Sequence, residues 1–182
     1  MRIVLTQRVL YHKKRAYDSI EHAWYRLLAT HTLSFLPNNP IQDFLDVAST
    51  HDLLILTGGD DSAIRRLTEF KISTEMMKQE KLILGVCHGA FTLVDALGGS
   101  IAADDKHMDC THSINYHDKQ INVNSYHSQV INKLHSTGVG LAYDEDGNCE
   151  SWIDNNIAGI AWHPERMDEP WIPDEIFYKF KL

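Results

Sequence analysis

Two short apolar runs constrain the fold of this 182-residue chain more than any other feature. They occupy residues 53–56 (Leu-Leu-Ile-Leu) and 82–86 (Leu-Ile-Leu-Gly-Val), and each leads through a turn into a stretch of helical character. Strands that are apolar on both faces are typical of a parallel sheet covered by helices on both sides. The sequence therefore predicts an α/β fold.

The two halves of the chain differ in their patterns. In the first half, strands and helices alternate, with strands also expected at residues 3–5 and 33–36. Helices are expected at residues 18–30, 41–48, 61–78 and 88–97. Strand-like runs with turn signals between them fill the second half, at residues 114–123, 138–143, 150–153 and 157–162, before a last helix at 173–180. We predict one domain, residues 1–182, with an open, mostly parallel sheet, helices on both faces and an antiparallel extension.

Composition excludes several classes of protein. The net charge of −8 argues against a nucleic-acid binder, which usually carries a basic stripe. No apolar run is long enough to span a bilayer, and the first residues do not resemble a signal peptide. The three cysteines, Cys87, Cys110 and Cys149, are widely spread and cannot all pair. We expect a cytoplasmic monomer or homodimer with no membrane partner.

A cysteine flanked by glycines follows the second apolar run, in the segment Gly85-Val86-Cys87-His88-Gly89. A nucleophile on a turn between a strand and a helix protrudes at the carboxyl end of the strand, and small glycines let the two elements approach. The amino terminus of the helix favours the thiolate. We therefore predict that Cys87 is a nucleophile. The alternative is a buried structural cysteine beside two loop glycines.

The segment Trp162-His163-Pro164-Glu165 supplies the residue types that would activate such a thiol. A nucleophile needs a base, and the base needs a partner that orients it. In an extended segment, residues two apart point the same way, so His163 and Glu165 are predicted to face one cavity. Glu165 would then fix the imidazole tautomer. The alternative is a surface histidine and glutamate in a turn.

A pair of glycines, Gly58-Gly59, follows the first apolar run. It lies at the carboxyl end of a strand, where open α/β sheets bind ligands. Its backbone is predicted to supply one amide of an oxyanion hole, and the amide of His88 the second. The alternative is an ordinary turn in which Asp60 or Asp61 caps the next helix.

These three segments, in this order and spacing, resemble the class I glutamine amidotransferase and γ-glutamyl hydrolase superfamily over most of the chain. Residues 123–129, Val-Asn-Ser-Tyr-His-Ser-Gln, are similar to a Val-Asn-Ser-x-His-x-Gln segment of that superfamily. Arg66 and Glu69 sit where γ-glutamyl hydrolases place an Arg…Glu pair. The resemblance implies a flavodoxin-like fold.

The resemblance also implies an activity, the hydrolysis of a γ-glutamyl amide bond through a thioester. It assigns Cys87 as nucleophile, His163 as base and then acid, Glu165 as its orienting partner, and the amides of Gly59 and His88 as the oxyanion hole. Substrate contacts are expected from Gly58, Ser125, Tyr126 and His127. Arg8 is a further expected contact, on separate grounds: it should lie at the carboxyl end of the first strand, where it could meet a phosphate or carboxylate. No cofactor is implied.

The finer resemblance is to a subgroup associated with bacterial surface-polysaccharide synthesis, which includes γ-glutamyl-CDP-amidate hydrolases. It rests on residues 6–9, Trp24 and residues 36–39. Two positions depart from the superfamily. Phe91 stands where many relatives carry a substrate-holding glutamine, and His88 where γ-glutamyl hydrolases often carry arginine. The substrate is therefore less constrained than the chemistry.

Two other functions remain open at this stage. One is a glutaminase subunit that delivers ammonia to a separate synthase, and the other is a non-catalytic binding domain on the same fold. A metal site is not predicted, since the nearest group of ligand types lacks a matched second pair. That group is His107, Cys110, His112 and His117.

Overall fold

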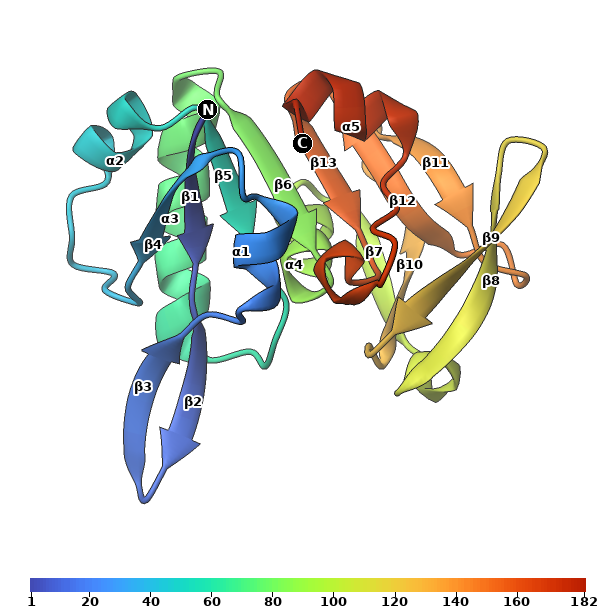
Figure 1. Cartoon of the computed structure of the whole chain (residues 1–182), viewed down its shortest axis with the longest axis horizontal. Helices are drawn as coiled ribbons and strands as arrows, with labels where there is room; N and C mark the ends of the chain where they lie inside the picture. Colours follow the sequence, from blue (N-terminus) through green and yellow to red (C-terminus); the bar gives the residue numbers. More distant parts are fainter.

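A computed structural model describes all 182 residues of the chain and shows one large mixed sheet with helices packed on it (Figure 1). The sheet has eleven strands, whose main path runs β4-β1-β5-β6-β13-β12-β11-β8-β9, with β7 and β10 attached at β12. Its strands are β1 (Arg2–Thr6), β4 (Thr32–Leu36), β5 (Leu53–Leu56), β6 (Leu82–Val86), β7 (Ser100–Ala103), β8 (Cys110–Tyr116), β9 (Lys119–Ser125), β10 (Gln129–Lys133), β11 (Val139–Tyr143), β12 (Cys149–Asp154) and β13 (Ile157–Ile160).

Helices and short helical turns lie between these strands or follow the last of them. They are α1 (Ala23–Leu27), α2 (Leu45–Thr50), α3 (Ala63–Lys78), α4 (His88–Ala96), η1 (Asp105–His107), η2 (Pro164–Arg166) and α5 (Asp174–Phe180). None of these helices combines the length and the apolar character that a membrane span requires.

Five strands, β4, β1, β5, β6 and β13, form a parallel half in which all carboxyl ends reach one edge. From β12 onward the pairing is antiparallel. This second part, β7 to β12, is called the antiparallel extension below. The predicted α/β fold, a parallel sheet with an antiparallel extension, is confirmed.

The apolar core lies in two layers, one on each face of the sheet. Successive residues of a strand alternate between them: Leu53 and Ile55 join the layer under α1 and α5, while Leu54 and Leu56 join the layer under α2, α3 and α4. The apolar run of β5 thus buries side chains on both faces, as the sequence predicts for a central parallel strand.

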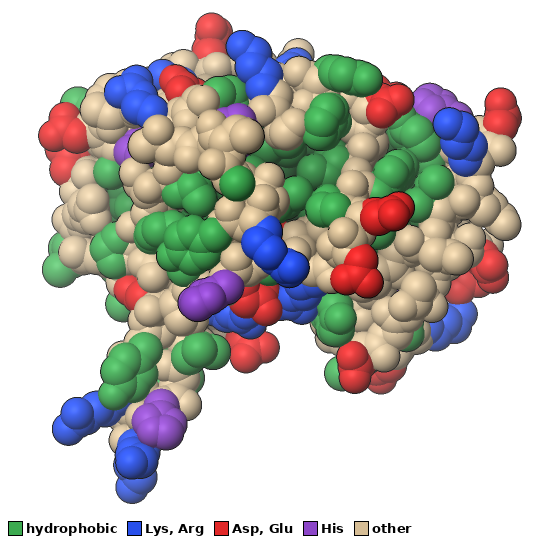
Figure 2. All heavy atoms as spheres, in the orientation of Figure 1, with side chains coloured by type: hydrophobic (Ala, Val, Ile, Leu, Met, Phe, Trp, Pro, Cys, Tyr) green, Lys and Arg blue, Asp and Glu red, His purple; other side chains and the backbone are tan.

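The helix predicted at residues 18–30 is wrong over much of its length. The chain forms a hairpin of β2 (Arg8–His12) and β3 (Arg15–Ser19), and only the five-residue α1 follows. The turn residues Lys13 and Lys14 both have positive φ, at 46° and 63°, a geometry usually signalled by glycine or asparagine. Neither residue gives that signal. The hairpin projects from the body of the molecule, and Figure 2 shows basic side chains at its exposed tip.

Three differences concern the antiparallel extension. The strand predicted at residues 114–123 is two strands, β8 and β9, joined by a turn at His117 with φ of 50°. Strands β7 and β10 have no counterpart in the prediction. Both are short, with four and five residues, and partly exposed. Of the remaining predicted elements, β5 and β6 have the predicted ends and the others are present with shifted ends; α2 begins four residues later than expected.

Candidate active site

Cys87 occupies the turn between β6 and α4, with φ of 50° and ψ of −110°. Its amide donates to the carbonyl of Ile160 on β13 at 2.8 Å, which joins the turn to the neighbouring strand. A Cβ at Gly85 would lie 2.5 Å from the carbonyl carbon of Gly89, and one at Gly89 would lie 2.2 Å from the Leu56 carbonyl oxygen. Both glycines are therefore required by the close approach of strand and helix.

His163 and Glu165 follow β13 and reach the same edge of the sheet. Their Nδ1 and Oε1 atoms are 2.6 Å apart, and each residue is 2% exposed. Because a carboxylate accepts at this contact, Nδ1 carries the proton and Nε2 is left for Cys87. Burial acts to lower the pKa of His163, but hydrogen bonds to Cys87 and Glu165 and the charges of both outweigh it and raise the pKa to about 9. The imidazole is held ready to carry a proton.

Gly58 lies directly against the His163 ring. A Cβ at Gly58 would fall 2.2 Å from the Cε1 atom of His163, so any side chain there would displace the imidazole. The next residue, Gly59, has φ of 118°, which turns its amide away from a regular strand-to-helix path. Neither the Gly59 amide nor the His88 amide donates a hydrogen bond within the protein. Both lie at the ends of adjacent strands, β5 and β6.

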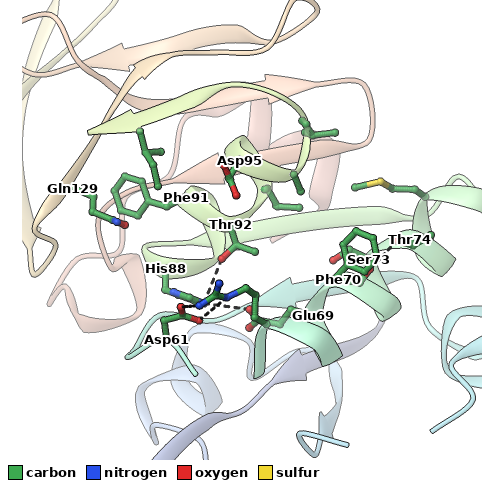
Figure 3. Close-up of a pocket in the computed structure, with 16 residues that line it drawn as sticks. Asp61, Glu69, Phe70, Ser73, Thr74, His88, Phe91, Thr92, Asp95 and Gln129 are labelled. Atoms are coloured by element: carbon green, nitrogen blue, oxygen red, sulfur yellow. Dashed lines mark hydrogen bonds and ion pairs between the residues drawn. The ribbon is translucent and has the colours of Figure 1, made fainter. Parts of the chain in front are cut away.

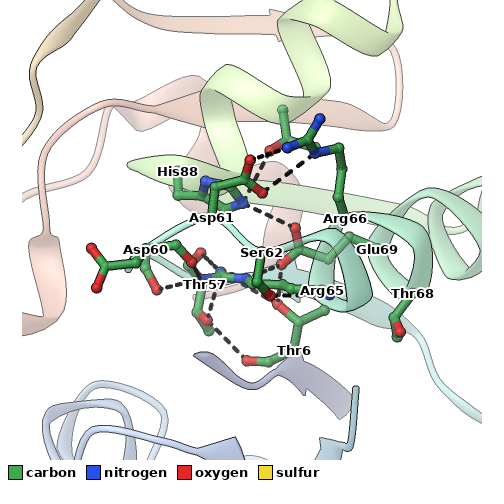
Figure 4. Close-up of polar contacts among 12 residues, drawn as sticks. Thr6, Thr57, Asp60, Asp61, Ser62, Arg65, Arg66, Thr68, Glu69 and His88 are labelled. Carbon is green, nitrogen blue, oxygen red and sulfur yellow. Dashed lines mark hydrogen bonds and ion pairs between the residues drawn. The ribbon is translucent and has the colours of Figure 1, made fainter. Parts of the chain in front are cut away.

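A buried ion pair of Arg65 and Glu69 supports the Gly58-Gly59 turn from the interior of the protein (Figure 4). Arg65 on α3 is fully buried, and its guanidinium donates to the carbonyls of Thr57, Gly58 and Asp60, and through Nε to Glu69 at 2.9 Å. The backbone that carries Gly58 and Gly59 is thus fixed from inside the protein. Helix α3 is capped by Ser62 rather than by Asp60 or Asp61, the caps named in the alternative interpretation of this turn.

Glu69 links the same ion pair to the nucleophile turn. It accepts from Thr6 Oγ1 at 2.8 Å, and its Oε2 is 3.3 Å from His88 Nε2. Burial acts to raise the pKa of Glu69, but hydrogen bonds from His88 and Arg65 and their charges lower it overall. The Arg…Glu pair expected at Arg66 is formed one residue earlier, at Arg65. Arg66 instead pairs with exposed Asp61. The i,i+4 spacing of Arg65 and Glu69 was the available sequence signal.

A rim beside His163, formed by Arg8, Glu21, Tyr126 and Arg166, is partly exposed and carries charges of both signs. Glu21 accepts from Arg166 at 2.9 and 3.0 Å and pairs with Arg8 at 3.0 Å. The guanidinium of Arg166 lies 4.7 Å from the centre of the Tyr126 ring, which in turn meets the His163 ring edge-on at 5.6 Å. The structure thus places Arg8 and Tyr126 near His163. Sequence reasoning missed Glu21 and Arg166, which are not part of any recognisable motif.

Two residues expected at the substrate, Ser125 and His127, have side chains directed elsewhere. Ser125 is fully buried and donates to the His107 carbonyl at 2.6 Å. His127 is 5% exposed and donates through Nδ1 to the Gln129 carbonyl. In this arrangement neither side chain reaches solvent beside Cys87. Ser125 is the last residue of β9, and in the loop that follows His127 turns inward while Tyr126 stays exposed.

A separate pocket of about 550 Å³ lies between α3 and α4 (Figure 3). His88 and Glu69 line one end of it, and Phe91 lines its wall. None of Cys87, His163 and Glu165 lines it. Phe91, which departs from the superfamily pattern, is 4% exposed and packs against the His127 ring at 5.3 Å.

Residues 14–181 match the family model described as "Glutamine amidotransferase class-I". The chain belongs to the class I glutamine amidotransferase family. It is thus an amidohydrolase-type domain of the class that hydrolyses the amide of glutamine.

Relatives and solved structures agree with that membership. The chain is 27% identical to "Putative glutamine amidotransferase-like protein YvdE" of Lactococcus lactis, over 74% of this chain and 75% of the relative. It is 28% identical to "Protein NtpR" of Enterococcus hirae, over 71% and 73%. A putative GMP synthase subunit from Thermoplasma acidophilum has a TM-score of 0.74 at 18% identity, over 99% of this chain and 92% of that one. A glutamine amidotransferase from Thermotoga maritima has a TM-score of 0.69 at 14% identity, over 90% and 76%. These structures share the fold.

Proposed function

We propose that this amidotransferase-family chain is a cysteine-dependent hydrolase of a γ-glutamyl amide, either glutamine or a γ-glutamyl conjugate. One observation carries the proposal. Cys87 stands on a turn with φ of 50° at the end of a buried strand, and Cys87 and Glu165 together raise the pKa of buried His163, whose Nδ1 is held by Glu165 at 2.6 Å. A nucleophile, a base and an orienting carboxylate in series are the arrangement that covalent acyl transfer needs.

In the first half of the reaction, the Cys87 thiolate attacks the γ-carbonyl carbon and forms a carbon–sulfur bond. The oxyanion is stabilised by the amides of Gly59 and His88, each contributing about 3 kcal/mol of barrier reduction. His163, which carries a proton on Nε2, gives it to the leaving nitrogen as the carbon–nitrogen bond breaks. A γ-glutamyl thioester and a free amine or ammonia result.

In the second half, water enters beside His163. The Nε2 atom, now without its proton, accepts one from the water, whose oxygen attacks the thioester carbon. The carbon–sulfur bond breaks, glutamate leaves, and the thiolate returns to its pairing with the imidazolium. Glu165 stays ionised throughout, because its role is to hold the Nδ1 proton and orient the ring.

The rim suits a γ-glutamyl group, which carries an α-carboxylate and an α-ammonium. Arg8 and Arg166 supply positive charge, Glu21 supplies negative charge, and Tyr126 supplies an exposed aromatic face beside His163. Guanidinium groups pair well with carboxylates. We propose that this rim holds the glutamyl head, with Gly58 leaving room for the ring of His163.

The three cysteines are unpaired, in keeping with a reducing cytoplasmic setting.

The test is glutamate release from a panel of γ-glutamyl compounds: glutamine, γ-glutamyl amines, short γ-glutamyl peptides and a γ-glutamyl nucleotide amidate. The chain and its Cys87→Ala variant are assayed side by side. Release from one compound that disappears in the variant is expected. Equal release from both proteins would contradict the role of Cys87.

A second candidate function is ammonia supply to a separate synthase. One observation favours it: α3 exposes Ile64, Leu67 and Phe70 on one side, at 43%, 53% and 61%, and Phe70 also lines the pocket that ends at His88. An apolar helix face of this kind suits a protein partner. Glutaminase activity that appears only when a co-purifying synthase is present would favour this candidate over a stand-alone hydrolase.

A non-catalytic binding domain is separated from both by the reactivity of Cys87 alone. An enzyme of either kind should show rapid alkylation of Cys87 at neutral pH, compared with Cys110 as an internal reference. Alkylation of Cys87 no faster than that of Cys110 would favour the binding domain.

A further inference from the structure

Four side chains from distant parts of the sequence converge inside the antiparallel extension. They are His107 from η1, His112 from β8, His127 from the loop after β9, and Glu150 from β12. One nitrogen or oxygen atom from each lies within 4.8 Å of all the others. Three imidazoles and one carboxylate therefore face a common centre.

None of these inward-facing atoms has a partner in the protein. His107 Nδ1, His112 Nε2, His127 Nε2 and Glu150 Oε2 are all buried and make no hydrogen bond to another protein group. His107, His127 and Glu150 are only 5%, 5% and 1% exposed. Buried polar atoms without partners are rare and costly, and four around one point need a shared explanation.

The spacing of these atoms suits a metal ion better than direct hydrogen bonds. Glu150 oxygens lie 3.8, 3.7 and 3.7 Å from the facing nitrogens of His107, His112 and His127, which is beyond hydrogen-bonding range. In a tetrahedral zinc site with bonds of about 2.0–2.1 Å, neighbouring ligand atoms are about 3.4 Å apart. The printed carboxylate–imidazole distances exceed that spacing by a few tenths of an ångström, and all four ligand atoms lie within 4.8 Å of one another.

The outer contacts of two histidines already fix the tautomers that a metal requires. His107 Nε2 lies 3.2 Å from the buried carboxylate of Asp144, which leaves the Nδ1 lone pair turned inward. His127 Nδ1 donates to the Gln129 carbonyl at 2.7 Å, which leaves its Nε2 lone pair turned inward. Carboxylate and carbonyl partners of this kind are typical of histidines that bind metal.

We propose that His107, His112, His127 and Glu150 bind one divalent zinc ion. Three histidines and one carboxylate match the ligand preference of zinc, and four protein ligands close the coordination shell, which is typical of a structural site. The proposal departs from the sequence-based expectation of no metal. It also replaces two members of the group considered there. Cys110 Sγ lies against the Lys106 carbonyl, and His117 pairs with Glu175 at the surface.

The ion would join segments that are up to 43 residues apart in the sequence, from His107 to Glu150. Strand pairing is sparse in this part of the sheet, since β10 and β12 share only one residue pair. It would also fix the loop that carries Tyr126, because His127 is the next residue and the Tyr126 ring contacts His163. The proposal concerns binding and does not depend on the proposed function.

The first test measures the metal content of the full chain, purified without a histidine tag, by mass spectrometry of its elements. About one zinc per chain is expected. The chelator-stripped chain is then titrated with Zn²⁺ against a coloured competing chelator, and with Co²⁺, which should show the intense visible bands of a four-coordinate site. Glu150→Gln, which keeps the side-chain volume, and His112→Asn should each bind Zn²⁺ at least about tenfold more weakly.

Two matched variants control for general effects of losing a ligand-type residue nearby. His117→Asn and Cys110→Ser remove ligand types close to the cluster in sequence and should bind Zn²⁺ like the unaltered chain. The zinc site is overturned if the unaltered chain binds no Zn²⁺ in the competition assay, if it binds another metal and rejects zinc, or if a control variant weakens binding as much as Glu150→Gln. Should both ligand variants fail to fold, the metal content and Co²⁺ spectrum of the unaltered chain decide the question.

Discussion

The parallel half and the antiparallel extension both bury charged groups, but they satisfy them differently. Under the Gly58-Gly59 turn, Arg65 and Glu69 pair with each other, and their remaining contacts go to backbone carbonyls, Thr6 and His88. In the extension, Glu150 faces three histidines without a hydrogen bond from any of them. In the first region, the buried charges therefore find their partners within the protein. The second lacks a positive charge at its centre, and we assign that charge to a metal ion.

The difference follows from what each region contains. The parallel half is covered by helices on both faces, so strand ends, helix amino termini and glycine turns meet at one edge and present backbone amides there. The end of the β8–β9 hairpin near Cys110 and Ser125 is packed only against the short helical turns η1 and η2, and the buried side chains there include the polar Ser125, His107 and His127. A region with little apolar core depends more on specific polar or metal contacts for its stability.

The largest loss of activity is expected from a change in the parallel half, at the carboxylate that orients His163. Glu165→Gln should reduce glutamate release about 10³- to 10⁴-fold, because the imidazole loses the carboxylate that orients it. His163 must be protonated to serve the leaving amine, so activity should fall as pH rises through its pKa of about 9. Glu165 is one of the groups that raise this pKa, so the alkaline limb should move to lower pH in the variant. A pH–rate profile measures both effects, and an unchanged alkaline limb would show that another group sets it.

Gly58→Ala should reduce turnover about 100-fold, because the added methyl overlaps the His163 ring and misplaces it. Gly147→Ala is the matched control, since it also replaces a glycine but its added methyl points into open space. The control, at φ of 85°, should lose some stability and keep its activity. Steady-state rates beside thermal unfolding separate the two variants. Equal rates in both would mean that Gly58 does not hold the ring in place.

Arg65→Met should lower the free energy of unfolding by about 3–5 kcal/mol, because it leaves Glu69 buried without its partner. Arg66→Met, one residue along, breaks only an exposed pair with Asp61 and should cost about 0–1 kcal/mol. Urea unfolding of the two variants makes the comparison. Similar losses in both would remove the distinction between a buried support and a surface contact.

The smallest effect on catalysis is expected from changes confined to the extension. A zinc chelator should speed amide hydrogen exchange in β8, β9 and β12 at least about tenfold while leaving β5 and β6 protected, because local opening is cheapest where contacts are few. Alkylation of Cys87 should change little. Exchange that rises equally across both regions would show that the two do not open separately.

Particular residues show what sequence alone could predict. The run at 53–56 matches β5 residue for residue, and the change from strand to helix at Cys87 matches the end of β6 and the start of α4. Such elements are set by local periodicity and glycine placement, which are visible in the sequence. The β2–β3 hairpin was missed because Lys13 and Lys14 adopt positive φ without being typical of it.

Long-range convergence was not visible in the sequence. The four cluster residues come from 107, 112, 127 and 150, with no paired spacing, so only the fold brings them together. The choice of Arg65 over Arg66 depends on which side of α3 faces the sheet. The i,i+4 spacing from Arg65 to Glu69 indicates that Arg65 is the partner, whereas the resemblance to relatives pointed to Arg66.

The most direct test of the triad is to trap the acyl intermediate. The chain is mixed with its best γ-glutamyl substrate, quenched in acid within one turnover, and digested for peptide mass spectrometry. The account predicts one glutamyl group on the peptide that contains Cys87, and none in the Cys87→Ala variant. Glutamate release with no adduct on Cys87 at any time, or with the adduct on Cys110 or Cys149, would contradict it.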